Sequence, residues 1–415
     1  MTDRRRVVVT GIGLVTPLGI GTDTVWKACL AGQSGIGPIS GIDVTDLPVR
    51  IAGQVAGFDA ADWLDPKERR LYDRFSQLGI AAAQLALDDA APGALPQRVA
   101  TIIASGEGGI ASLSTGVSAA QISPQHVSPT LLPAIVPNAC ASAVARRYRF
   151  DGPSYSPTTA CSSGADAVGQ GFQLVADGYT DMCVAGGTEA PIARWFLAGF
   201  ANMRALSRRN DDPARASRPF TLHRDGFVLA EGAAILVLED LDSAIARHAT
   251  IHAEVRGYAA GTDHHHLTAP DPTGAAAALT ISRALRDADL TPPEVGYINA
   301  HGTSTRLNDA AETLAIKTAF GAHAHSVAIS STKSMTGHML GATGAVEAAL
   351  CCLACRHQTV PPTINYNDPD PACDLDYTPN VARRLPINVA MSTSLAFGGH
   401  NATLVVRRYP ESADT

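Results

Sequence analysis

The sequence lacks an uninterrupted apolar run of about 18 residues, the length that a membrane-spanning helix needs, so we expect no membrane span. Its start is basic and then apolar, which resembles a signal peptide. However, Thr10, Gly11, Gly13 and Thr16 interrupt the apolar stretch, and no small-residue cleavage site follows. We therefore interpret this start as a first β-strand and its glycine turn.

Cysteine is present without the spacing of a disulfide framework or a zinc site. The CxxC pair Cys352 and Cys355 has no second pair and lies inside an apolar helical run. Three consecutive histidines at 264–266 cannot all face one ion from an extended loop, so we expect no metal. Buried free thiols in a chain without a signal peptide predict a reducing, cytoplasmic compartment.

Lysine is scarce and there is no excess of positive charge. The net charge is −7, which argues against nucleic acid as the main partner but leaves room for a local basic patch. Lysine occurs only at positions 27, 67, 317 and 333, so the other 28 basic residues are arginines. Lys333 lies in an otherwise uncharged stretch, which makes it a candidate functional residue.

The chain has 415 residues, enough for two tightly joined core units. Short apolar strands alternate with helices, which is typical of α/β layers. Strand and glycine-turn patterns at 99–109, 158–171 and 232–241 return in the same order at 295–305, 330–348 and 401–409. These echoes suggest a duplicated α/β unit with halves at 1–250 and 251–415.

Cys161 lies between an extended segment and a helix. The helical spacing of the apolar residues after it, at 165, 168, 172 and 175, places Cys161 at or just before the helix N-terminus. Unpaired N–H groups and the helix dipole there favour an anion, so we expect a lowered thiol pKa and a nucleophile suited to thioesters. From this stretch alone, a buried core cysteine is an equally good interpretation.

Two histidines occur in glycine-rich turns of the second half. His301 directly follows the apolar strand at 295–298, where α/β proteins place ligands. His338 precedes an alanine-rich helix, whose N-terminus favours a neutral imidazole that can donate to a developing oxyanion. Lys333 lies five residues before His338, and its candidate partners are Asp309, Glu312 and Glu347.

Phe397 is followed by Gly398 and Gly399 just before the last strand. Two glycines after an aromatic residue indicate special backbone angles or a close approach. Backbone N–H groups there could complete an oxyanion hole, but from this stretch alone a tight turn is the favoured interpretation.

In order, the motifs VVVTGIGLVTPLG, TACSSG, GGTEA, RPFTLHRDGFVLAEGA, NAHGTSTRLND, KSMTGHMLGATGAVEA and FGGHNATLVV cover nearly the whole chain. Together they resemble the discrete (type II) β-ketoacyl synthase family. The resemblance implies an α/β thiolase fold, in which duplicated βα halves form a five-layer α-β-α-β-α sandwich. The first half, 1–250, would carry the nucleophile, and the second, 251–415, both catalytic histidines.

The resemblance also implies site roles. Cys161 would carry the acyl group, while His301 and His338 bind the malonyl thioester and promote its decarboxylation. The N–H groups of Cys161 and Phe397 would hold the thioester oxyanion, and Phe397 would gate the acyl pocket beside Gly398. The remaining implied roles are Lys333 ordering the site through Glu312, Asp309 supporting that network, and Thr303 and Thr305 contacting phosphopantetheine.

The implied partner is acyl carrier protein, which brings its own phosphopantetheine, so we expect no cofactor on this chain. An acidic carrier needs a local basic patch on this enzyme. The candidate docking residues are Lys67, Arg69, Arg70, Arg204, Arg208 and Arg209. The chain would form a homodimer, or a heterodimer with a chain-length-factor subunit.

Three positions depart from the family's pattern. Glu107 stands where an apolar residue usually lines the acyl pocket, and a carboxylate there would suit a short or polar chain unless it turns outward or meets a partner subunit. Ala396 stands where glycine is common before the gating Phe, and His400 replaces a common threonine.

Four functions fit this resemblance. The arginine-rich composition and Glu107 favour a polyketide ketosynthase, and the alternative is a β-ketoacyl synthase of fatty-acid elongation. A non-catalytic chain-length factor usually lacks the nucleophile that Cys161 provides here. A degradative thiolase uses a second cysteine as base, where this chain has histidine.

Overall fold

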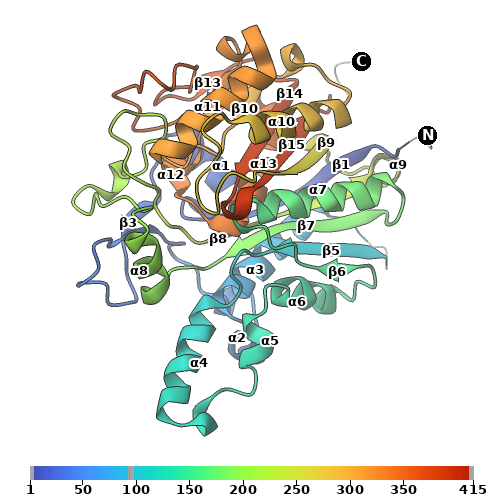
Figure 1. Cartoon of the computed structure of the whole chain (residues 1–415). Helices are drawn as coiled ribbons and strands as arrows, with labels where there is room; N and C mark the ends of the chain where they lie inside the picture. The colour runs from blue at the N-terminus through green and yellow to red at the C-terminus, as the bar shows by residue number, and fades with distance from the viewer. Residues whose placement is uncertain (1–3, 92, 94–97, 411–415) are drawn as a thin grey trace.

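The computed structural model describes residues 4–91, 93 and 98–410 (Figure 1). One mixed sheet of eleven strands runs through the molecule in the order β11-β10-β14-β15-β9-β1-β8-β7-β5-β6, with β2 (Gly19–Ile20) paired to β1. The strands of the first half are β1 (Val7–Thr16), β5 (Val99–Ala104), β6 (Ser154–Tyr155), β7 (Met182–Glu189) and β8 (Gly232–Asp240). Those of the second half are β9 (Ala253–Thr262), β10 (Tyr297–Asn299), β11 (Ala328–Ser330), β14 (Val389–Leu395) and β15 (His400–Arg407).

The two half-sheets join where β1 and β9 pair antiparallel through three residues each, 7–9 and 253–255. Helices α7 (Ser163–Ala176) and α13 (Thr343–His357) contact one another and lie between the half-sheets. Helices α3 (Arg74–Ala90) and α6 (Ala139–Tyr148) cover one outer face, and α10 (Ala275–Asp287) and α11 (Arg306–Phe320) cover the other (Figure 1). The predicted five-layer sandwich is therefore confirmed.

Small residues determine how closely α7 and α13 approach. A Cβ on Gly164 of α7 would lie 3.2 Å from the Ala345 Cβ of α13, and a Cβ on Gly344 would lie 2.8 Å from the Ala165 Cβ. Side chains there would push the helices apart. This reciprocal contact of glycine with alanine brings the starts of both helices side by side.

Shorter elements surround this core. They are α1 (Thr22–Leu30), α2 (Pro66–Leu71), α8 (Arg194–Asn202), α9 (Leu241–Ala246), α12 (Lys333–Thr336), β3 (Ile36–Pro38), β4 (Ile51–Gly53), β12 (Thr359–Val360) and β13 (Arg383–Arg384). The described helices are all too short or too polar to cross a bilayer.

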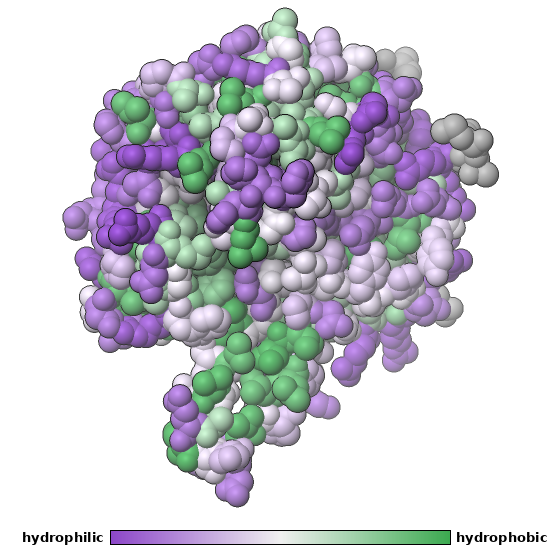
Figure 2. All heavy atoms as spheres, in the orientation of Figure 1, coloured by the Kyte–Doolittle hydropathy of each residue, from purple (hydrophilic) through white to green (hydrophobic). Residues whose placement is uncertain are grey.

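Helices α4 (Ile110–Ile122) and α5 (Leu131–Ile135) extend away from the body (Figure 1). Their surface is largely apolar (Figure 2), and Val117, Ile122, Leu132 and Val136 are exposed. The edge strand β6 closes the same end of the sheet. This chain therefore presents an apolar surface and an unpaired strand edge from its first half.

Candidate active site

Cys161 lies in a one-turn 3₁₀ segment, residues 160–162, directly before α7, as its sequence context predicts. The preceding residue, Ala160, has φ 50, a left-handed conformation that alanine rarely adopts. The Ser163 hydroxyl donates to the Ala160 carbonyl at 2.6 Å and accepts from Thr159 N at 2.8 Å. Cys161 is partly exposed, whereas the other seven cysteines are buried free thiols, as expected.

The expected lowering of the Cys161 pKa is wrong. Burial raises the pKa of the thiol to about 12, while the charge of Lys333 and a hydrogen bond from Phe397 N–H act in the opposite direction. Loss of water around the sulfur therefore outweighs the favourable helix terminus. The resting thiol is protonated near neutral pH, so its use as a nucleophile requires a base.

Two buried imidazoles from the second half stand beside this thiol. His301 follows β10 and His338 follows α12, and their ring centroids are 5.4 Å apart at an interplanar angle of 86°. Burial, together with the charge of Lys333, lowers the pKa of both rings well below its usual value. His338 Nδ1 is 3.0 Å from Thr343 Oγ1. Both rings are therefore neutral, which was predicted for His338.

Lys333 pairs with Glu347 of α13 rather than with Glu312. Its Nζ lies 2.6 Å from Glu347 Oε1, and both side chains are 1% exposed. Burial raises the pKa of Glu347 to about 7, and the Lys333 charge opposes this. Glu312 instead accepts hydrogen bonds from His301 N and Gly302 N, both at 2.7 Å. The implied action of Lys333 through Glu312 is therefore corrected, because backbone N–H groups occupy that carboxylate.

Asp309 belongs to a different network from the one implied. It accepts from Phe220 N at 2.8 Å and lies 3.4 Å from the buried Arg224 guanidinium. Arg224 also donates to the carbonyls of Thr305 and Arg306, both at 3.0 Å. Asp309 and Arg224 thus hold the loop after His301 rather than contacting Lys333.

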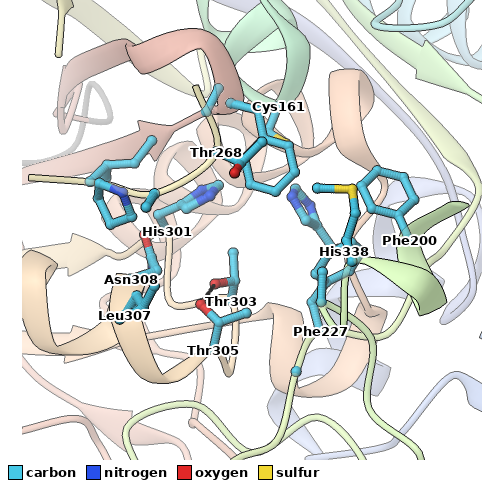
Figure 3. A pocket seen from close by; sticks show the side chains of 18 of the residues that line it. Cys161, Phe200, Phe227, Thr268, His301, Thr303, Thr305, Leu307, Asn308 and His338 are labelled. Atoms are coloured by element: carbon cyan, nitrogen blue, oxygen red, sulfur yellow. Dashed lines mark hydrogen bonds between the residues drawn. The ribbon is translucent and has the colours of Figure 1, made fainter. Parts of the chain in front are cut away.

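A cavity of about 610 Å³ joins these groups. Cys161, His301, His338 and Phe397 line it together with Thr303 and Thr305, whose hydroxyls are 2.9 Å apart. In Figure 3 the two imidazoles face the space next to Cys161, and the threonines lie farther along the cavity. The predicted nucleophile, histidines and threonines therefore share one site.

The 397–399 turn closes one side of the cavity. Gly398 has φ 80 and Gly399 has φ 76, and a Cβ on Gly399 would lie 1.8 Å from the Asp263 carbonyl oxygen. Gly398 N–H donates to the Leu267 carbonyl at 2.7 Å, so this N–H group is already hydrogen-bonded within the protein. The Phe397 ring lies 6.3 Å from the Phe200 ring. The turn is therefore tight, and the Phe397 N–H donates a hydrogen bond to the Cys161 sulfur, while the implied oxyanion and gating roles of Phe397 stay predictions.

Glu107 does not line this cavity, contrary to the expected pocket role. The residue as a whole is exposed on this chain, but loss of water around its carboxyl group still raises the pKa of Glu107, and its charge contributes to the raised pKa of Cys161. Its N–H lies 3.3 Å from Glu189 Oε1. The carboxylate therefore turns outward, next to the start of α4.

Glu189 was not singled out from the sequence. It is fully buried at the end of β7, and it accepts from Ser105 Oγ at 2.8 Å, Gly106 N at 2.7 Å and Gly341 N at 3.0 Å. It thus ties the turn after β5 to the loop after His338. The sequence feature that could have identified Glu189 is an acidic residue at the end of an apolar strand, in the motif GGTEA.

The candidate docking residues are spread over two elements. Of the six, only Arg204 lines the cavity, and Arg209 is half-buried near Asp225. Lys67, Arg69 and Arg70 are exposed on α2, and Arg208 is exposed after α8. In the 264–266 histidine run, the third residue lines the cavity and the first two line a neighbouring groove.

The raised thiol pKa makes a prediction for alkylation. Iodoacetamide reacts with the thiolate, so the rate at Cys161 should rise about tenfold per pH unit between about pH 7 and 9.5. Peptide mapping by mass spectrometry assigns the adduct. A plateau near the pKa of about 8.5 of an ordinary thiol, or below it, would contradict the burial argument.

Comparisons with known proteins agree with this geometry. Two family models match, the β-ketoacyl synthase N-terminal domain over residues 4–244 and the C-terminal domain over residues 252–367. The chain is 46% identical over 411 residues to 3-oxoacyl-[acyl-carrier-protein] synthase 2 of Synechocystis sp., covering 98% of this chain and 99% of that protein. It is 43% identical over 415 residues to the protein of that name from Staphylococcus aureus, covering 99% and 100%.

Solved structures share the fold across the whole length. A type II polyketide ketosynthase in complex with its acyl-carrier protein aligns with TM-score 0.90 and 35% identity, covering 98% of this chain and 100% of that one. The ishigamide ketosynthase/chain length factor aligns with TM-score 0.91 and 35% identity, with the same coverage. From its family models, its near full-length relatives and its fold, this chain belongs to the β-ketoacyl synthases, the acyl-transferring condensing enzymes of the thiolase fold.

Proposed function

We propose that this chain elongates fatty acids by condensing an acyl group held on Cys161 with malonyl-acyl carrier protein. The observation that carries the proposal is one cavity in which a partly exposed thiol meets two neutral, buried imidazoles. The relatives named 3-oxoacyl-[acyl-carrier-protein] synthase 2 support the fatty-acid assignment over a polyketide one.

In the first step, the Cys161 sulfur attacks the thioester carbonyl of the incoming acyl group. Because the thiol is protonated, its proton passes to a neutral imidazole of the site. The carbonyl oxygen becomes an oxyanion that the N–H groups of Cys161 and Phe397 stabilise. The carrier's thiol then leaves with a proton, and the acyl group remains on Cys161.

In the second step, malonyl thioester replaces the free carrier. His301 and His338 donate hydrogen bonds to its thioester carbonyl, so the carbon–carbon bond to the carboxylate breaks and carbon dioxide leaves. The resulting enolate carbon attacks the acyl thioester on Cys161. The Cys161 sulfur departs as a thiolate, which the Phe397 N–H and the charge of Lys333 stabilise.

Substitution of Cys161 separates these steps. Cys161→Ala should abolish condensation because no acyl-enzyme forms, whereas Cys161→Gln should keep release of carbon dioxide from malonyl-acyl carrier protein. Condensation is measured by mass spectrometry of the carrier-bound product. Asp177→Asn, at an exposed acid directly after the C-terminal end of α7, is the control. Normal condensation by the Ala variant would refute the mechanism.

A polyketide ketosynthase is the second candidate. It is supported by the structural likeness to type II polyketide ketosynthases, one of them a ketosynthase/chain length factor. Copurification distinguishes the candidates: an elongating enzyme is recovered as one kind of chain, whereas a polyketide enzyme that needs a chain-length factor is recovered with a second, related chain.

We further propose that a second copy of this chain covers α4, α5 and the edge of β6. The argument is the apolar, exposed character of α4 and α5 beside an unpaired strand edge. Glu107 lies three residues before α4, so its outward carboxylate would come to lie near this interface.

Charge substitution tests the interface. Leu132→Glu, at a site 71% exposed on α5, should weaken the dimer by roughly tenfold or more, because a carboxylate would be buried against the partner. The matched control is Val381→Glu, at a site 73% exposed elsewhere on the chain. Analytical ultracentrifugation gives the dissociation constants. Equal effects of both substitutions, or a monomeric wild type, would reject the proposed interface.

A further inference from the structure

Asp166 is a buried acid in the first turn of α7, five residues after Cys161. It is 4% exposed, and its neighbours Ala165 and Ala167 belong to the central apolar core. Its carboxylate has no ion pair in the part of the chain that the structure describes. A carboxylate in such surroundings is costly unless hydrogen bonds compensate for the lost water.

The compensating hydrogen bonds come from both sides of the nucleophile. The Thr159 hydroxyl donates to Asp166 Oδ2. The Ser162 hydroxyl donates to the Thr159 carbonyl at 2.9 Å and lies 3.4 Å from the same carboxylate oxygen. Thr159 and Ser162 flank the 160–161 segment in the sequence. The carboxylate therefore holds Thr159 directly, and the Ser162 hydroxyl closes the turn that carries the thiol onto Thr159.

That turn needs external support. Ala160 is held at φ 50, and residues in this region persist only where the surrounding structure fixes them. The hydroxyl of Ser163 supplies a local brace. The contacts of Asp166 connect the turn to α7 and, through Tyr258, to β9.

The other oxygen of Asp166 reaches the second half of the molecule. Tyr258 of β9 donates its hydroxyl to Asp166 Oδ1 at 2.6 Å. The Tyr258 ring lies against α7, where a Cβ on Gly169 would come within 2.2 Å of it, so its position is fixed. Burial raises the pKa of Asp166, whereas the hydroxyl donors and nearby His400 lower it. The second half also supplies His301, His338 and Phe397.

We propose that Asp166 is a positioning residue for the nucleophile: with Tyr258 it fixes the Cys161 sulfur relative to the two histidines and the Phe397 N–H. It acts through the hydroxyls of Thr159 and Ser162 and does not touch substrate. The inference rests on the proposed function, because it assigns Asp166 to the acyl-transfer step and not to decarboxylation.

Asp166→Asn tests this role, since the amide keeps the volume but has only one oxygen, so it cannot accept from both the Thr159 and the Tyr258 hydroxyl on opposite sides. Acylation of Cys161 by acyl-carrier protein and its alkylation by iodoacetamide should both slow roughly tenfold or more, as expected when a reacting group is misplaced. Decarboxylation of malonyl-acyl carrier protein, measured in a Cys161→Gln background, should stay within about twofold. The matched control is Asp177→Asn, an exposed acid at the other end of α7.

Tyr258→Phe is the second variant, in case Asp166→Asn does not fold. It removes one donor to Asp166 and leaves every atom of the turn unchanged. It should slow both Cys161 reactions in the same direction and add nothing to Asp166→Asn in the double variant. Unchanged Cys161 rates in Tyr258→Phe, or an equal loss of all three activities with a lowered Tm, would overturn the proposal. Alkylation needs no substrate, so it still tests Asp166 if the wild type accepts no acyl group and the proposed function fails.

Discussion

The close contact of α7 with α13 is the constraint on which the site depends. Each helix opens with a loop that carries chemistry, Cys161 before α7 and His338 before α13. Gly164 and Gly344 let the helices approach so closely that a Cβ on either glycine would press against an alanine of the other helix. A single added methyl there would cost about 1–3 kcal/mol, and the forced shift would separate the thiol from the imidazoles. Packing and catalytic geometry are therefore set by the same four small residues.

Burial in this middle layer also sets the charges of the site. It raises the pKa of the Cys161 thiol and lowers the pKa of both imidazoles, so the resting thiol is protonated and both rings are neutral near pH 7. Lys333 and Glu347 form a buried ion pair beside these groups. A buried pair of this kind contributes little net stability, yet breaking it typically costs about 3–5 kcal/mol because an unpaired charge stays behind.

Local sequence patterns predicted the features that depend on neighbouring residues. The helical spacing after Cys161 located the nucleophile at a helix start, and the repeated strand and turn motifs indicated the duplicated fold. The thiol pKa was predicted in the wrong direction because the apolar cluster against which Cys161 packs comes from segments far from it in the sequence, among them Phe196 and Leu340. Likewise, the sequence left three carboxylates as partners for Lys333. The choice of Glu347 depends on how α12 packs against α13, which no local pattern encodes.

The orientation of Glu107 is a second feature that local sequence patterns could not determine. Its sequence position allowed a pocket wall, an outward side chain or a contact with a partner subunit, and on this chain it does not line the cavity and is exposed beside α4. A surface that a second chain would cover cannot be recognised from local patterns in one chain. The role of Glu107 is therefore tied to the proposed dimer rather than to the cavity described above.

The most direct test of the account is intact-protein mass spectrometry after mixing the chain with acyl-carrier proteins that bear acyl groups of different lengths. The account predicts a mass increase equal to one acyl group, which peptide mapping assigns to Cys161. A chain that gains no acyl group from any carrier, or gains it on another residue, would contradict the account.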